Sequence, residues 1–192
     1  MKKSIFTLML VALATGVMAQ GYTHSVGATV GTLYGVSYKG FIISDNLALE
    51  VDLGVNLMST PVSSTMTYLG TKTTTSGTWN GCYTFEVNPN ILYQAGIANW
   101  DFGGLAWYAG GGVSIGFIDD IKYSGNPSFK WGVNATGGVE LKLSSVPLAI
   151  SFDFRPGYGM YTDSADDGGG NKISIASSFF DWKLAAGVRY TF

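Results

Sequence analysis

Charged residues are scarce in this chain of 192 residues, since only 12% are Asp, Glu, Lys or Arg. An ordinary soluble domain carries about 25%, so the charged coat of such a domain is missing. The formal net charge is -2, and no Lys/Arg cluster occurs beyond Lys2 and Lys3. Because a polyanion is bound through clustered basic residues, we do not expect nucleic acid as a partner.

Cysteine is nearly absent, and the motifs of cofactor sites are missing. The single Cys82 cannot form an internal disulfide or a cysteine metal cluster, and we expect a spare thiol at a strand edge. Glycine runs at 110–112 and 168–170 lack the ending and the strand-to-helix setting of a phosphate-binding loop. The acidic stretch 163–171 lacks the ligand spacing of an EF-hand. We therefore predict no cofactor and no metal.

Only the N-terminus contains a long apolar run. Residues 1–19 begin with two lysines, continue through an apolar segment at 5–13 and end on Ala19. This pattern is typical of a secretory signal peptide cleaved after Ala19. A transmembrane anchor needs about 20 apolar residues, and polar residues interrupt this segment. No cysteine at the cleavage site could accept a lipid, so we do not expect a lipoprotein. The mature chain, residues 20–192, is expected to form one domain.

What the mature chain does contain is alternation of apolar residues with period two, the pattern of β-strands. It continues to the end, because every second residue from Trp182 to Phe192 is apolar. Pro89 interrupts one strand, where we expect a bulge, and a break at 32–35 divides the first two strands. Most strands have the 9 to 11 residues or slightly more that cross a bilayer when tilted. We predict eight strands and no helix: 22–31, 35–43, 47–58, 83–94, 104–117, 131–143, 148–158 and 180–192.

All charged residues of these strands fall on one face, together with Gly, Ser, Thr and Asn, and the other face is apolar. A soluble eight-stranded ligand carrier has the same alternation turned inside out, but it needs the charged coat that is missing here. Aromatic residues at both ends of the apolar face match the two interfaces of a membrane. We predict an all-β, eight-stranded antiparallel up-and-down transmembrane β-barrel. Its lumen holds a near-neutral charge network: Lys39, Glu50, Asp52, Glu86, Glu140, Lys142, Asp153, Arg155, Asp181, Lys183 and Arg189.

The connections alternate in length. Short turns at 44–46, 96–102 and 144–147 alternate with longer polar loops. Short turns belong on the periplasmic side and long loops on the outside, so both termini are expected in the periplasm. The long loops are predicted at 59–82, 118–130 and 159–179.

Three internal segments and the C-terminus carry a resemblance to a known family. The segments are GVSYKGFI, NLALEVDLG and PLAISFDFRPGY, and the chain ends on Gly187-x-x-Tyr190-x-Phe192. With the signal peptide and eight strands, they resemble the small eight-stranded outer-membrane β-barrel proteins of Gram-negative bacteria, with their porin-like outer-membrane β-barrel domain. The resemblance implies the cell outer membrane, contact with its lipids, and an assembly signal at Gly187, Tyr190 and Phe192 that the barrel-assembly machinery reads.

Function is expected at the long loops, because binding residues often lie on loops of a rigid scaffold. The leading prediction is surface interaction or adhesion with host or surface ligands, with a structural envelope role close behind. Two alternatives are a lipid-modifying enzyme and a small porin-like channel. Some barrels that this chain resembles are such enzymes, but His24 is the one histidine and lies at the periplasmic end, away from the outer leaflet, so we predict no enzyme. Eight strands leave an interior that side chains fill, which disfavours a channel.

Overall fold

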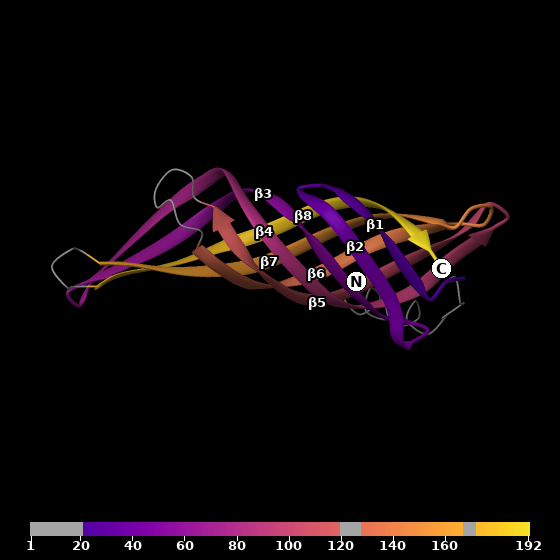
Figure 1. The fold of residues 1–192 in the computed structure, drawn as a ribbon, viewed down its shortest axis with the longest axis horizontal. Coiled ribbons are helices and arrows are strands. Elements are labelled where there is room, and N and C mark those ends of the chain that lie inside the picture. Colours follow the sequence, from indigo (N-terminus) through magenta and orange to yellow (C-terminus); the bar gives the residue numbers. More distant parts are fainter. Residues whose placement is uncertain (1–20, 120–127, 167–171) are drawn as a thin grey trace, which may run out of the picture.

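A computed structural model describes residues 21–119, 128–166 and 172–192, which form a closed antiparallel barrel (Figure 1). Each strand pairs with the next, and β8 pairs back with β1. The prediction of an all-β antiparallel sheet with an eight-strand ring is confirmed. In these ranges no helix reaches the length and apolarity of a membrane crossing. The predicted signal peptide lies outside the described residues. The strands are β1 (His24–Gly31), β2 (Leu33–Ser44), β3 (Leu47–Tyr68), β4 (Thr71–Trp100), β5 (Gly103–Asp119), β6 (Ser128–Leu143), β7 (Leu148–Asp166) and β8 (Lys172–Thr191).

The predicted long loop at 59–82 is wrong, because β3 and β4 continue through it as one hairpin. Only Leu69 and Gly70 turn the chain, with φ of 47° and 80°, and two positive φ angles suit a tight hairpin whose twist matches its strands. The sequence hides these strands because their residues are mostly Ser and Thr, which favour β-structure without marking an apolar face.

The other two predicted loops are also shorter than expected. Strand residues include 159–166 and 172–179 of the predicted loop 159–179, and 118–119 and 128–130 of the predicted loop 118–130. The remaining residues of both loops lie outside the described residues. Two of the short turns are also tighter than predicted, since only two residues separate β2 from β3 and β4 from β5, while the turn at 144–147 is as predicted.

The tip of the β1–β2 hairpin lies between β3 and β8. The two strands are divided at Thr32, inside the predicted break. The Thr32 backbone N–H donates to the Leu184 carbonyl at 2.9 Å, and the Thr32 carbonyl accepts from the Leu57 N–H at 2.9 Å. Gly31 has a φ of 148°, which a residue with a Cβ rarely adopts. The hairpin therefore ends as a wedge that is hydrogen-bonded on both sides.

Beyond this wedge, β3 pairs directly with β8, from Val62 opposite Phe179 to Thr67 opposite Ser174. Because β4 continues beside β3 and β7 beside β8, four strands extend past the barrel, at the left of Figure 1. We call this extension the projecting sheet. It comprises residues 61–68, 71–78, 160–166 and 172–179.

Pro89 lies in register, so the predicted bulge at this residue is wrong. It is opposite Val51 of β3, and the register with β5 continues unshifted from Val87 to Asn90. Pairing with β5 is only interrupted between these two residues, which fits a residue that has no N–H to donate. The bulge of β4 against β5 lies instead at Ile97, between Gly96 and Ala98.

The wedge gives a prediction for Gly31→Ala. A Cβ at Gly31 would lie 2.1 Å from the Leu184 carbonyl oxygen, and the backbone conformation is strained for alanine, at about 1 to 3 kcal/mol. We expect the free energy of unfolding, measured by urea titration of the folded protein, to fall by at least that amount. Gly137→Ala is the control, because a Cβ there meets nothing within 4 Å. Equal stability of the two variants would contradict the wedge.

Candidate functional site

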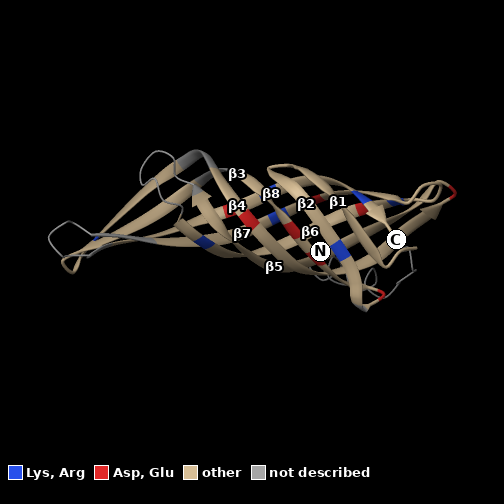
Figure 2. Ribbon diagram, in the orientation of Figure 1, with Lys and Arg blue, Asp and Glu red and all other residues tan. Residues whose placement is uncertain are grey.

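Eleven charged side chains are buried in the barrel interior, each at most 4% exposed. They come from β2, β3, β4, β6, β7 and β8 and lie inside because inward positions alternate along each strand (Figure 2). Their contacts divide them into two groups. The arginine cluster comprises Lys39, Glu50, Asp52, Glu140, Asp153, Arg155 and Arg189. The lysine cluster comprises Glu86, Lys130, Asp181 and Lys183.

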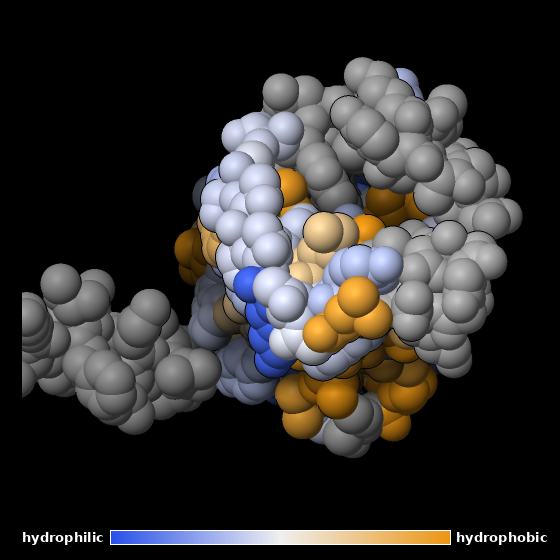
Figure 3. Space-filling view, turned by 90° about the vertical axis from the view of Figure 1, so that its left-hand side faces the viewer, coloured by the Kyte–Doolittle hydropathy of each residue, from blue (hydrophilic) through white to orange (hydrophobic). Residues whose placement is uncertain are grey.

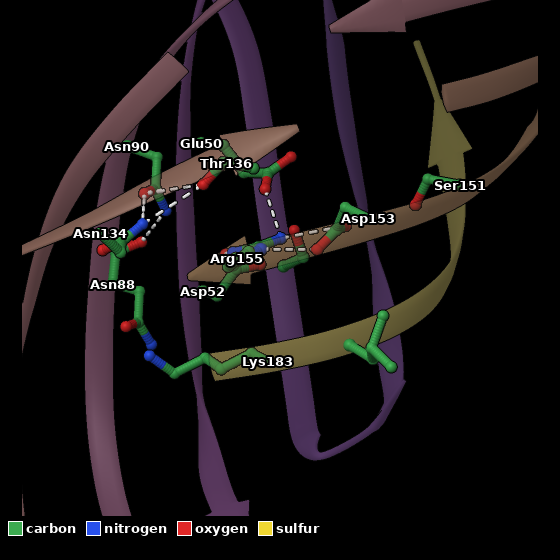
Figure 4. A network of polar contacts seen from close by, with 12 residues as sticks. Glu50, Asp52, Asn88, Asn90, Asn134, Thr136, Ser151, Asp153, Arg155 and Lys183 are labelled. Atoms are coloured by element: carbon green, nitrogen blue, oxygen red, sulfur yellow. Dashed lines mark hydrogen bonds and ion pairs between the residues drawn. The ribbon is translucent and has the colours of Figure 1, made fainter. Parts of the chain in front are cut away.

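Arg155 holds three carboxylates at once (Figure 4). Its Nη2 lies 2.8 Å from Oε1 of Glu50, its Nε lies 2.6 Å from Oδ1 of Asp153, and its Nη1 contacts Oδ2 of Asp52. These carboxylates come from β3 and β7, so one guanidinium joins opposite parts of the barrel wall. Charge-assisted contacts of this kind are among the stronger hydrogen bonds in proteins.

Arg189 and Lys39 complete the arginine cluster. Arg189 Nη2 donates to Oε2 of Glu50 at 2.7 Å, so Glu50 bridges the two arginines. Glu140 Oε2 accepts from Arg189 Nη1 at 3.2 Å and from Lys39 Nζ at 3.1 Å. Lys39 also donates to the Gln94 side chain. Three cations and four carboxylates thus share one continuous network.

The lysine cluster is balanced, with two cations and two carboxylates. Lys130 Nζ lies 2.7 Å from Glu86 and 2.9 Å from Asp181. Lys183 Nζ contacts the same two carboxylates, at 3.2 and 3.0 Å. Buried ions are tolerated when they are paired in this way.

Side-chain amides and hydroxyls adjoin the lysine cluster, as Figure 4 shows. Asn88 Nδ2 donates to Glu86 at 3.3 Å, and Ser114 Oγ donates to Asn88 at 2.5 Å. Asn134 Nδ2 donates to Asn90 Oδ1 at 2.6 Å. Most of the polar side chains in the interior therefore satisfy each other, as buried polar groups require; the exceptions are side-chain oxygens of Thr29, Asp52 and Asn56.

Aromatic and apolar groups lie at both ends of this polar interior. Toward the projecting sheet, Val62, Ile118 and Phe179 form a buried cluster. The Phe179 ring lies 5.3 Å below Lys130 Nζ, within the range of a cation–π contact. At the other end, the Tyr22 hydroxyl donates to Glu140 at 2.5 Å.

Two lysines differ from the sequence prediction. Lys142 was placed in the network, but its Nζ donates to the Leu143 carbonyl at 2.7 Å and the Val146 carbonyl at 3.3 Å, at the β6–β7 turn. That prediction is wrong, because Lys142 lies at the end of its strand. Lys130 was missed because it falls in the predicted loop 118–130. A signal was present, since Lys130 shares the even, inward parity of Asn134 and Glu140.

His24 has aromatic neighbours. Its Nδ1 lies 2.9 Å from the Tyr38 hydroxyl oxygen, and its ring centroid lies 5.8 Å from that of Phe192. These contacts place it where the two ends of the barrel sequence meet. Within the described part of the chain, no three His, Cys, Asp or Glu residues gather as metal ligands. The Cys82 side chain lies outside the described residues.

The three residues of the expected assembly signal lie on both faces of β8. Tyr190 and Phe192 are exposed on the outer face, with ring centroids 6.2 Å apart. Gly187 points inward, where a Cβ would lie 2.6 Å from Ser151 Oγ. The Phe192 backbone N–H donates to the His24 carbonyl at 2.8 Å, and its carbonyl accepts from the His24 N–H at 2.9 Å. The last residue therefore takes part in closing the barrel.

No family model, no curated protein and no solved structure matches the chain.

The arginine cluster gives a prediction for Arg155→Ala. Removing the guanidinium leaves Glu50, Asp52 and Asp153 without a shared cation, and breaking a buried pair costs about 3 to 5 kcal/mol. We expect the free energy of unfolding in urea to fall by that amount. Lys142→Ala is the control, because this lysine contacts only carbonyls at the rim, and its cost is expected within about 0.5 kcal/mol. Similar losses in both variants would contradict the network.

Proposed function

We propose that the protein is an integral outer-membrane β-barrel with a closed polar lumen. Its function is surface interaction or adhesion through the projecting sheet and the connections beyond it, or that of a structural envelope protein. One observation carries the proposal: charge is buried inside and large apolar side chains are exposed outside. Phe152 is 55% exposed, Val133 54% and Val188 53%. An apolar face that continues around a barrel is unfavourable in water and is expected against lipid.

The outer face changes character at the projecting sheet, which supports an interface there. Along β8, exposed Trp182 and Phe180 are followed on the same face by Ser178, Ala176 and Ser174. In the neighbouring strands Thr65 is opposite both Ala176 and Thr74. In the end view of Figure 3, mostly pale and blue residues lie toward the viewer with a few orange ones among them, and more orange residues lie around the barrel behind them. Aromatic residues at such a boundary suit a membrane interface.

The interior disfavours the channel alternative. Salt bridges cross the lumen, and aromatic or apolar groups lie at both of its ends. An interior of this width is filled by its own side chains. We expect no steady large conductance in planar bilayers.

The position of His24 disfavours the enzyme alternative. Its contacts are aromatic, and it lies at the end of the barrel where the C-terminus also lies. If the short turns face the periplasm, this end is remote from the outer leaflet. Such chemistry needs a nucleophile within hydrogen-bond reach of the base, and the hydroxyl within reach of His24 is that of Tyr38, at this same end of the barrel.

The proposed membrane face gives a prediction for Ala186→Arg. Ala186 is exposed midway between Trp182 and Tyr190 on the outer face of β8, and an arginine at the bilayer midplane costs about 2 to 4 kcal/mol. We expect that loss of stability in lipid vesicles. Ala176→Arg is the matched control, because Ala176 lies on the same face of the same strand within the projecting sheet. Equal costs would argue against a lipid-facing belt.

The proposed assembly role gives a prediction for the C-terminal residue. Deleting Phe192 removes an exposed ring and its hydrogen bonds to His24. If the barrel-assembly machinery reads this aromatic, membrane insertion in cells should fall far more than folding of the pure protein into detergent. Phe192→Trp is the control and should retain both. Normal membrane insertion of the deletion variant would contradict the assembly role. Closure of the barrel would then be the remaining explanation for an aromatic residue at 192.

The functional proposal is tested in cells in two steps. Fractionation and a gel shift between unheated and boiled samples should locate a folded barrel in the outer membrane; a soluble periplasmic protein would refute this. Residues 63–76 are then replaced by an Asn-Gly turn, since Val62 and Gly77 lie opposite each other at that point. Loss of adhesion or serum survival supports a surface role, whereas loss of envelope integrity alone supports the structural role.

A further inference from the structure

The arginine cluster has one carboxylate more than it has cations, and its contacts locate the excess charge. The carboxylate oxygens of Glu50, Glu140 and Asp153 all accept hydrogen bonds. Asp52 uses Oδ2 for Arg155, while its Oδ1 is buried without a partner. Seven of eight carboxylate oxygens are thus satisfied, and the remaining one is Oδ1 of Asp52.

Among the described residues, two other buried side-chain oxygens also have no partner, Asn56 Oδ1 and Thr29 Oγ1. Asp52 and Asn56 flank Gly54 on the inward face of β3. Gly54 is opposite Gly35 of β2, which is opposite Thr29 of β1. The three oxygens therefore belong to residues that border a part of the wall where Gly35 and Gly54, on two adjacent strands, contribute no side chain.

We propose that this part of the lumen binds a hydrated monovalent alkali cation, held by Oδ1 of Asp52. One excess negative charge calls for one positive charge, because an uncompensated buried ion is costly. Carboxylate, amide and hydroxyl oxygens are the ligands that hard cations prefer. Water molecules of the hydrated ion would donate to Asn56 and Thr29, and a polar site with several acceptors suits buried water.

A proton on Asp52 is the competing way to balance the charge. It would neutralise the carboxylate, but its single O–H can donate to only one acceptor. At least one of the buried oxygens Asn56 Oδ1 and Thr29 Oγ1 would still lack a donor. A hydrated cation provides both the missing charge and the missing donors, so it fits the three atoms better.

Thermal unfolding in matched salts tests the proposal. Folded protein in a zwitterionic detergent is heated in NaCl, KCl or N-methylglucamine chloride at one ionic strength and near-neutral pH. We expect Na⁺ or K⁺ to raise the midpoint saturably, by roughly 3 to 6 °C at ten times the dissociation constant. Asp52→Asn should lose this dependence, because the amide removes the excess charge. Asp45→Asn makes the same chemical change at an exposed carboxylate in the β2–β3 turn, away from the lumen, and should keep the dependence.

A second measurement needs no variant. Crystals grown in RbCl should give an anomalous difference peak beside Asp52, since Rb⁺ replaces a monovalent cation. Equal midpoints in the three salts, or a cation effect that persists in Asp52→Asn, would overturn the proposal. A midpoint that rises as pH falls, with no difference between salts, would assign the balance to a proton and overturn it as well.

Discussion

Charges that are sealed inside a narrow barrel must be paired, and much of this structure depends on that constraint. Eleven charged side chains of the described residues lie in the interior, where an eight-stranded ring leaves no room for bulk water. Glu50 is central, because it joins Arg155 to Arg189 and so links β3, β7 and β8. The same pairing permits an outer face without charge, since the polar groups of the strands are satisfied inward.

Closure of the barrel depends on a second feature, the short β1–β2 hairpin. Its tip at Thr32 is hydrogen-bonded to both β3 and β8, and beyond it these two strands pair with each other. The barrel therefore changes from a ring that includes β1 and β2 to an open projecting sheet. The outer face of this sheet presents Ser and Thr side chains, whereas the outer face of the barrel presents apolar ones. This difference supports a change from lipid to water where the projecting sheet begins.

The faces of the strands could be predicted from the sequence, because alternation with period two assigns each residue to one side. Ten of the eleven predicted network residues are buried in the interior. Lys142 is not buried in the network, because alternation does not tell how far along a strand a residue lies from the end of the barrel. Lys130 could not be assigned to the network, because β6 begins at Ser128, before the apolar alternation starts. The pairing of Asp52, Asn56 and Gly54 with their neighbours depends on register between distant strands, which composition does not encode. The Ser/Thr-rich strand segments 59–68 and 71–82 have no apolar alternation, so the sequence predicts a loop there.

The roles of Pro89 and Gly31 also depend on pairing between strands, which the sequence pattern does not reveal. Pro89 predicted a bulge, yet it lies in register where pairing with β5 lapses, and the bulge is at Ile97. The need for glycine at residue 31 follows from its approach to Leu184, a contact made across more than 150 residues of sequence.

Fluorescence quenching of the outward tryptophans tests the central claim most directly. Trp79 and Trp100 are replaced by Phe, which leaves Trp107, Trp131 and Trp182 on the outer face of β5, β6 and β8. If this face contacts lipid, phospholipids with brominated acyl chains should quench the emission strongly, and aqueous iodide should quench it little. Strong quenching by iodide without an effect of brominated lipid would contradict the account.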